Sequence, residues 1–244
     1  NHIKFCVGTK MRMRRKPYAR EELKACPFDI DEPLAYKGIW RTAFQNPENP
    51  LYVELGMGKG GFISKLAHQH KDINFLGIDI KSEVIVVAKR NIESVYGQDA
   101  IDNIKIMSWD IERLFMMMSE EDSIDRIYIN FCNPWPKHGD KKHRLTYPRQ
   151  LKMYAKFLKP GAQLRFKTDD DGLYKDTERY LIEEGWKIIF NSCDFERTPM
   201  PENIVTEHEK MYMEEGKKIK GMIALPPEKI QNATNSCANE KQNV

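Results

Sequence analysis

The feature that most constrains this fold is a regular alternation of short apolar runs with longer segments of helical periodicity. Five apolar runs rich in Ile, Val, Leu and Phe predict strands over residues 51–55, 73–79, 104–109, 124–131 and 163–167. The segments between them predict helices over residues 62–70, 82–96, 111–118 and 148–158. Strands that alternate with helices through short connections favour a parallel, doubly wound sheet.

Two more apolar runs complete the pattern. Residues 186–190 and 219–225 predict strands, and residues 205–215 between them predict a helix. The expected fold is therefore an α/β, Rossmann-like single domain with a mostly parallel, seven-stranded sheet. We assign this domain to residues 31–225.

The two ends of the chain differ from this pattern. Residues 1–30 are expected to form a basic, flexible arm, since residues 10–20 carry six basic side chains and no acid and would be attracted to polyanions. Met11 is a candidate start, which would leave residues 1–10 outside the natural chain. Residues 226–244 are rich in Asn, Gln, Lys and Glu and predict a disordered polar tail.

Composition excludes several classes of protein. The five cysteines are widely spaced and never form a C-x-x-C pair, which argues against a disulfide framework or a zinc site and for a reducing cytoplasm. No apolar run approaches the roughly 20 residues of a membrane span, and the N-terminus lacks the apolar stretch of a secretory signal. We therefore expect a cytoplasmic protein; its net charge of +3 does not by itself indicate a nucleic-acid partner.

A glycine-rich turn follows the first predicted strand. Gly56, Gly58 and Gly61 match G-x-G-x-x-G, and Asp79 ends the second predicted strand 23 residues after Gly56. Ligands bind at the carboxyl ends of the strands in such sheets, where an acid can accept from ribose hydroxyls. A dinucleotide-dependent oxidoreductase is one interpretation, whereas a Walker P-loop is excluded because Phe62 stands at the lysine position.

Two acids favour S-adenosylmethionine over a dinucleotide. Glu54 lies inside an apolar strand, where a buried carboxylate is costly unless it is paired, and the cationic amino group of a methionine moiety would pair it. Asp110 ends the third predicted strand, where it can accept from an adenine amino group.

The stretch after the fourth predicted strand, Asn130-Phe-Cys-Asn-Pro-Trp-Pro-Lys137, predicts a rigid turn because each proline fixes φ and removes a donor. Residues 137–144 then carry four permanent cations and two histidines against one acid. A basic loop beside Trp135 suits a phosphate backbone and a base. A solvated charged loop would normally be favoured, but the position of this loop beside the expected methyl donor reverses that preference. His138 and His143 have no cysteine or third histidine nearby, so we expect no metal site.

Two acidic clusters lie further along. Asp169, directly after the fifth strand, is expected to face the cleft, whereas Asp171 is a candidate N-cap of the next helix. Thr206-Glu-His-Glu209 predicts a capping box.

Together with Gly77-Ile-Asp79, Lys142-His-Arg144-Leu and Lys167-Thr-Asp169, these motifs resemble the bacterial tRNA (guanine-N7-)-methyltransferases over roughly residues 11–225. The resemblance implies a class I S-adenosylmethionine-dependent fold and methyl transfer to N7 of the variable-loop guanine of tRNA, with S-adenosylhomocysteine as product. The residues that it implies as contacts of the methyl donor are Glu54, Gly56, Gly58, Asp79, Asp110 and Asn133. Those that it implies as substrate contacts are Lys137, Asp169, Thr206 and Glu209, and those that it implies as RNA contacts are Gly139, Asp140, Lys141, Lys142, His143 and Arg144.

One position departs from the family. Many members have Asp-Pro-Trp-Pro, with the Asp as the active-site residue, and this chain has Asn133 there. Because guanine N7 carries a free lone pair, it can attack without losing a proton. We therefore predict that the catalytic role of Asn133 is to orient the reactants.

Three alternatives stay open at this point. The nearest is a methyltransferase acting on an exocyclic amine, because Asn-Pro-Pro-aromatic turns serve that chemistry. The others are an NAD(P)-dependent oxidoreductase and a non-catalytic RNA-binding protein. The expected partner is tRNA, with no membrane and no obligate protein partner, and the expected assembly is a monomer or a homodimer.

Overall fold

The computed structural model describes residues 19–228, and within them the chain forms a seven-stranded sheet. The strands are β1 (Leu51–Leu55), β2 (Asn74–Asp79), β3 (Ile104–Ser108), β4 (Ile124–Asn130), β5 (Leu158–Thr168), β6 (Lys187–Ser192) and β7 (Lys220–Leu225). Their order is β3-β2-β1-β4-β5-β7-β6. The first five are parallel, and β7 runs antiparallel to both β5 and β6. The predicted mostly parallel, doubly wound sheet is confirmed.

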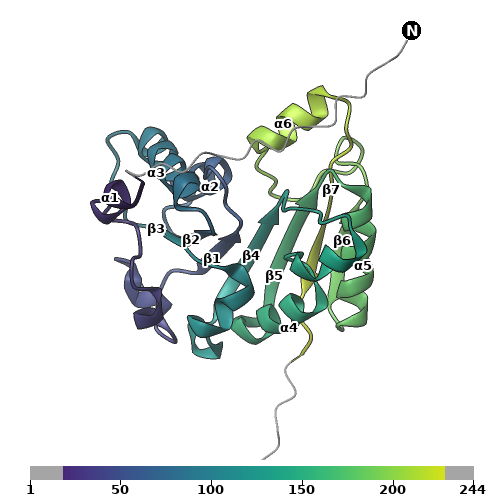
Figure 1. Ribbon diagram of the computed structural model, residues 1–244, viewed down its shortest axis with the longest axis horizontal. Helices are drawn as coiled ribbons and strands as arrows, with labels where there is room; N and C mark the ends of the chain where they lie inside the picture. The colour runs from purple at the N-terminus through teal and green to yellow at the C-terminus, as the bar shows by residue number, and fades with distance from the viewer. Residues whose placement is uncertain (1–18, 229–244) are drawn as a thin grey trace, which may run out of the picture.

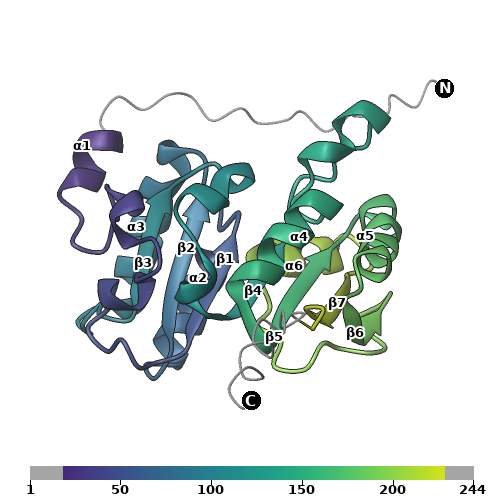
Figure 2. The ribbon, with the colours of Figure 1, turned by 90° about the horizontal axis from the view of Figure 1, so that it is seen from below.

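Helices cover both faces of the sheet (Figures 1 and 2). The α-helices are α1 (Ala19–Lys24), α2 (Gly61–Gln69), α3 (Ser82–Tyr96), α4 (Pro148–Phe157), α5 (Asp171–Glu183) and α6 (Glu207–Glu214). Shorter 3-10 helices are η1 (Pro33–Tyr36), η2 (Trp40–Ala43), η3 (Ile111–Met116), η4 (Glu120–Asp122) and η5 (His138–His143).

Two apolar cores follow from the alternation of side chains along the strands. On one face, Phe75 and Ile104 pack with Ile63 of α2 and Ile85 of α3. On the other face, side chains such as Val53 and Leu76 pack with residues of α4 and α5. Because both faces are covered, most side chains of the central strands are buried, and the strands stand out in the sequence as runs rich in Ile, Val, Leu and Phe.

The helix predicted over residues 111–118 differs from the structure in type and length. The segment forms the 3-10 helix η3, with a kink at Arg113. Ile111, Leu114, Met117 and Met118 are buried, a spacing that an α-helix and a 3-10 helix can both produce.

The fifth strand is longer than predicted. Lys159-Pro160-Gly161 resembles a turn in the sequence, yet β5 already begins at Leu158, which pairs with Ile124 of β4. A register shift between Ile124 and Arg126 accommodates this extra length.

The expected flexible arm over residues 1–30 also needs correction. In α1, Ala19 and Leu23 are buried against α3, which lies beside α1 in Figures 1 and 2. The backbone at residues 28–30 then pairs with Ile106 of β3 through two hydrogen bonds of 2.9 Å. Residues 19–30 therefore belong to the folded domain, whereas residues 1–18 of the arm and residues 229–244 of the predicted tail lie outside the described residues.

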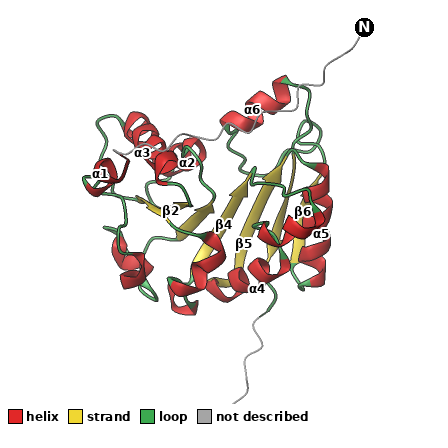
Figure 3. Ribbon diagram, in the orientation of Figure 1, coloured by secondary structure: helices red, strands yellow, loops and turns green. Residues whose placement is uncertain are grey.

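The order of the strands places β1 beside β4, so the topology reverses between these two strands. The carboxyl ends of β4 and β5 point toward α6, as the strand arrows in Figures 1 and 3 show. This edge of the sheet is where ligands bind in folds of this kind.

Candidate active site

The glycine-rich turn links the carboxyl end of β1 to α2. Gly56 and Gly58 have φ values of 77° and 54°, in the left-handed region that favours glycine. The Gly58 amide donates to Asp79 Oδ2 at 3.0 Å, and the Gly56 amide donates to the Ile78 carbonyl at 2.8 Å. The turn therefore folds back onto the end of β2 and brings two of the predicted cofactor contacts, Gly58 and Asp79, together.

Glu54 is the most unusual side chain of this edge. It is 3% exposed, and its Oε1 accepts a hydrogen bond of 2.9 Å from Asn130 Nδ2 on β4. Its Oε2 is buried and has no hydrogen-bond partner among the described residues. Burial raises the pKa of Glu54 to about 8, and the Asn130 amide, the Lys167 ammonium and the Ile63 backbone amide offset this only in part. A buried carboxyl oxygen without a donor fits a cationic or hydrogen-bonding ligand.

Asp79 and Asp110 lie at the rim of the same edge, where both are partly exposed. The Asp110 side chain is 41% exposed and caps η3 by accepting from the Glu112 amide at 3.0 Å. Each carboxylate keeps further acceptor capacity, since a carboxylate has about four lone-pair sites.

The turn after β4 carries Asn133, which is exposed. Its Oδ1 accepts from the Trp135 amide at 3.2 Å, and Trp135 has a φ of 40°, unusual for a residue other than glycine. The Trp135 ring lies 5.5 Å from the His143 ring, centroid to centroid. The turn is therefore tied to the basic segment that follows it.

The basic segment forms the 3-10 helix η5, and its charged side chains divide into two groups. Lys141 Nζ lies 2.7 Å from Asp176 Oδ2, and His143 Nδ1 lies 2.8 Å from Glu112 Oε1. By contrast, Lys137 and Lys142 are exposed, and within residues 19–228 their side chains have no hydrogen bond or ion pair. Gly139 and Asp140 lie in the first turn of this helix.

Arg144 differs from the role that the resemblance implies. Its side chain is 2% exposed, and the guanidinium donates to the Pro134 carbonyl at 2.7 Å and to Asp176 at 2.6 Å. Buried and bonded within the protein, it is not presented to RNA in this structure.

The capping box at Thr206–Glu209 is confirmed. Thr206 Oγ1 accepts from the Glu209 amide at 2.9 Å, and Glu209 Oε2 accepts from the Thr206 amide at 3.4 Å. Glu209 is 1% exposed, and its carboxylate also accepts from Lys167 Nζ at 2.8 Å and from Asn203 Nδ2 at 2.6 Å. Glu209 therefore anchors residues 203–209 to β5, and its carboxylate faces no open space where a substrate could lie.

The acidic run after β5 also needs one correction. Asp170, and not Asp171, is the N-cap of α5, because Asp170 Oδ1 accepts from the Leu173 amide at 2.6 Å. Asp171 is exposed and pairs with Lys220 at 2.9 Å. Asp169 is partly exposed and directly follows β5.

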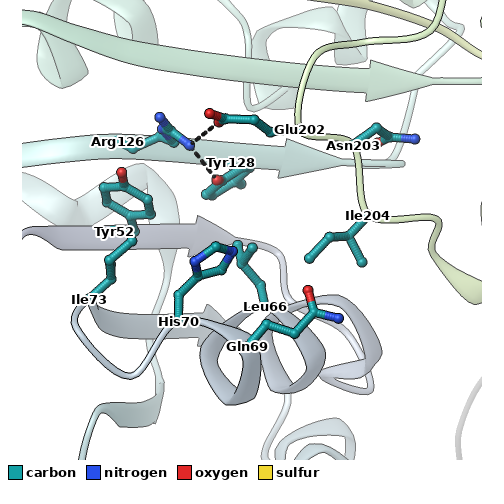
Figure 4. Close-up of a pocket in the computed structure, with 10 residues that line it drawn as sticks. All are labelled: Tyr52, Leu66, Gln69, His70, Ile73, Arg126, Tyr128, Glu202, Asn203 and Ile204. Carbon is teal, nitrogen blue, oxygen red and sulfur yellow. Dashed lines mark hydrogen bonds and ion pairs between the residues drawn. The ribbon is translucent and has the colours of Figure 1, made fainter.

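A pocket of about 330 Å³ lies on the same face of the sheet as Glu54 but further back along the strands (Figure 4). Tyr52, Arg126 and Tyr128 from β1 and β4 form its floor, and Arg126 lies between Glu202 and Tyr128. None of the residues predicted from the sequence lines this pocket. The candidate site is therefore defined by the strand ends and not by this cavity.

Three residues that complete the site have no assigned role in the sequence interpretation: Asn130, which holds Glu54, Lys167, which holds Glu209, and Asp176, which holds Arg144. Their partners are 76, 42 and 32 residues away along the chain. No local spacing could have indicated these pairs.

Within residues 19–228, no group of three or more His, Cys, Asp or Glu side chains could hold a metal ion, and the absence of a metal stays a prediction. None of the helices in this range has the length and apolarity that crossing a membrane requires.

The sheet order, the glycine-rich turn and the acids near the ends of successive strands are those of a class I methyltransferase. A family model described as "Putative methyltransferase" matches residues 48–222. The solved structure of the 16S rRNA methyltransferase KamB is similar in fold, with a TM-score of 0.53 at 13% identity, over 73% of this chain and 89% of that chain.

Sequence comparison narrows the class to one family. A tRNA (guanine-N(7)-)-methyltransferase of Ruminiclostridium cellulolyticum is 50% identical over 226 residues, covering 91% of this chain and 95% of that protein. A protein of the same name from Clostridium perfringens is 49% identical over 216 residues, covering 88% of this chain and 99% of that protein. The chain belongs to the tRNA (guanine-N(7)-)-methyltransferase family, which confirms the resemblance.

Proposed function

We propose that this protein transfers a methyl group from S-adenosylmethionine to N7 of the variable-loop guanine of tRNA and releases S-adenosylhomocysteine. The observation that carries the proposal is the identity of about half of all residues, over nearly the whole chain, to proteins named for this reaction. The arrangement of the strand ends supports it in three respects.

The first is the fit of the methyl donor. The unpartnered Oε2 of Glu54 would accept from the donor's ammonium group, which supplies the cation that this buried acid lacks. The positive φ of Gly56 and Gly58 lets the backbone turn close to the ligand, and Asp79 would accept from ribose hydroxyls. Asp110 would accept from the adenine amino group. When bound, S-adenosylmethionine supplies a methyl group already activated on a sulfonium.

The second is the position of Asn133. An amide oxygen, like a carboxylate oxygen, has two lone pairs, so Asn133 Oδ1 can accept from the Trp135 amide and from a further group of the substrate or of the methyl donor. Such a hydrogen bond would orient the reactants and leave the guanine N7 lone pair free to attack the methyl carbon. Asn133 then removes no proton, because the attacking atom carries none.

The third is the distribution of exposed charge. Lys137, His138 and Lys142 are exposed beside the Asn133 turn, where the two lysine ammonium groups would contact phosphates of the substrate. Gly139 and Asp140 would lie at the same RNA surface, and Asp169 would face the target nucleotide. We assign Thr206 and Glu209 to shaping this surface, since their polar groups bind each other.

The test is incubation with labelled S-adenosylmethionine and unmodified tRNA, followed by analysis of the nucleosides. Label in 7-methylguanosine supports donor, substrate and atom together. A tRNA with adenine in place of the variable-loop guanine is the control and should stay unlabelled. Label in an N-methylated exocyclic amine would replace the proposal by the amine-directed alternative. No label from a preparation that binds S-adenosylhomocysteine would contradict it.

A further inference from the structure

The turn that carries Asn133 cannot hold its conformation with its own hydrogen bonds. Pro134 and Pro136 lack amide donors, and Trp135 stands at a positive φ that a non-glycine residue adopts only when its surroundings impose it. Inside the turn, the Trp135 amide donates to Asn133 Oδ1 at 3.2 Å. The carbonyls of Pro134 and Trp135 need donors from elsewhere.

Arg144 supplies those donors. Its Nε donates to the Pro134 carbonyl at 2.7 Å, and its Nη2 donates to the Trp135 carbonyl at 3.4 Å. The guanidinium is planar and presents its donors in a fixed fork, so bonding to both carbonyls fixes their relative orientation. With its side chain 2% exposed, Arg144 is committed to this task.

Asp176 on α5 holds the guanidinium from the other side. Its Oδ2 accepts from Arg144 Nη1 at 2.6 Å and from Lys141 Nζ at 2.7 Å. Although partial burial raises the pKa of Asp176, hydrogen bonds from Lys141 and Arg144 lower it to about 2, so the carboxylate is ionised at neutral pH. One acid on a rigid helix is thus connected through Arg144 to the backbone of the turn.

We propose that Arg144 and Asp176 are positioning residues that hold the Asn133–Pro136 turn in the geometry that presents Asn133 to the substrate base, and that Arg144 makes no contact with RNA. This inference rests on the proposed methyl transfer. It reverses the interpretation of Arg144 as one more cation of the basic segment.

The experiment compares two conservative variants, Arg144→Lys and Asp176→Asn, with two comparison variants. Arg179→Ala is the matched control, because Arg179 is exposed and touches Asp176 Oδ1 at 3.3 Å but does not touch the turn. Lys142→Ala represents loss of an exposed cation. For each protein, kcat is measured per site that binds S-adenosylhomocysteine, and KM for tRNA is measured over a series of salt concentrations.

We expect kcat of Arg144→Lys to fall by about 100-fold, the effect of misplacing a reacting group by about 1 Å. The salt dependence of KM should equal that of the wild type. Asp176→Asn should lower kcat in the same way but less, and the double variant should fall no further than Arg144→Lys, since both act through one turn. Arg179→Ala should behave as the wild type, and Lys142→Ala should lose about one unit of the salt slope.

Three results would overturn the inference. A wild-type kcat with a raised KM and a salt slope lower by about one would make Arg144 an RNA contact. If Arg144→Lys and Asp176→Asn both keep the wild-type kcat and the wild-type salt dependence of KM, Arg144 and Asp176 do not position the turn. If Arg144→Lys does not fold, Asp176→Asn alone decides, and a wild-type kcat for it refutes the inference. Absence of 7-methylguanosine with the wild-type protein refutes the proposed function itself, whatever the variants do.

Discussion

The two halves of the strand-end edge use buried acids in opposite ways. On the β1 side, Glu54 is buried, and one of its carboxyl oxygens has no hydrogen-bond partner among the described residues. On the β5 side, Glu209 is equally buried, but donors from Lys167, Asn203 and Thr206 satisfy its carboxylate. Both glutamates lie in motifs that point to ligand binding, so the sequence makes them look alike.

The difference separates a binding group from an architectural one. A buried polar atom without a partner costs free energy that a ligand can recover, whereas a fully paired one fixes the segments that it connects. Glu54 is therefore poised for a cationic ligand, and Glu209 fastens the segment before α6 to the sheet.

Removing the partner of Glu209 should be the most damaging change. Lys167→Met would leave a buried carboxylate unpaired, which typically lowers the free energy of unfolding by about 3–5 kcal/mol. Denaturant unfolding measures this, with Lys217→Met as control, because that lysine pairs with Glu215 at the surface. The double variant Lys167→Met/Glu209→Gln should recover much of the lost free energy of unfolding, because it no longer buries an unpaired charge. If Lys167→Met lowers the free energy of unfolding by less than about 1 kcal/mol, as for an exposed ion pair, the Lys167–Glu209 pair does not stabilise the fold.

The same conservative substitution at the two glutamates should affect the cofactor very differently. Glu54→Gln removes the charge that would pair with the ammonium group, so the Kd for S-adenosylhomocysteine should rise by about 10- to 100-fold, as for other hydrogen bonds to charged groups. Glu209→Gln should change this Kd by less than about threefold, because its carboxylate points to Lys167. Calorimetric titration measures both Kd values. Equal changes of Kd in the two variants would contradict the division into a ligand-binding and an architectural glutamate.

The raised pKa of Glu54 adds a pH dependence with a definite sign. With a pKa of about 8, the carboxyl is mostly protonated at pH 7 in the free protein. A bound cation favours the ionised form, so binding should release a proton, and affinity should increase as the pH rises toward 8. Titrations in buffers of different ionisation enthalpy count the proton, and Glu54→Gln should release none at this site. Proton uptake by the wild type would contradict the assignment.

The order of strands and helices can be predicted from the sequence because it depends on the local pattern of apolar side chains. The central strands are covered on both faces, so each one is a short, mostly apolar run between amphipathic helices. The 3-10 form of η3 cannot be predicted from the apolar pattern, because the buried residues Ile111, Leu114, Met117 and Met118 fit an α-helix equally well. The burial of residues 19–30 is not evident from the sequence, because the basic composition of residues 10–20 dominates a segment whose apolar side chains are few and irregularly spaced: Ala19, Leu23, Cys26, Phe28 and Ile30.

The candidate site was readable only in part. The position of Glu54 inside an apolar strand correctly predicted a buried acid, because burial follows from the strand itself. The state of Arg144 and Glu209 depends on Asp176 and Lys167, which are distant in sequence and meet them only in the fold. A cation in a basic motif looks the same whether it faces RNA or a buried carboxylate.

The basic segment offers a smaller version of the same contrast. Lys142 is exposed without a side-chain partner in the described part of the chain, whereas Lys141 already pairs with Asp176. Lys142→Ala should lower the slope of log affinity for tRNA against log salt by about one. Lys141→Ala should lower it by less, since part of its charge is neutralised inside the protein. Binding titrations over a salt series test this, and identical slopes for the two variants would contradict the division.

The smallest effect is expected at the position where the chain departs from its family. Asn133→Asp keeps the side-chain oxygen that accepts from the Trp135 amide, so the turn should survive. Guanine N7 has no proton to lose, and a carboxylate therefore offers no advantage as a base. We expect kcat to change by less than about tenfold, measured as 7-methylguanosine formed at saturating donor, whereas Asn133→Ala, which loses the turn's acceptor, should fall further. A gain beyond about 100-fold for Asn133→Asp lies in the range of general-base catalysis and would show that the reaction at this edge needs a proton acceptor after all.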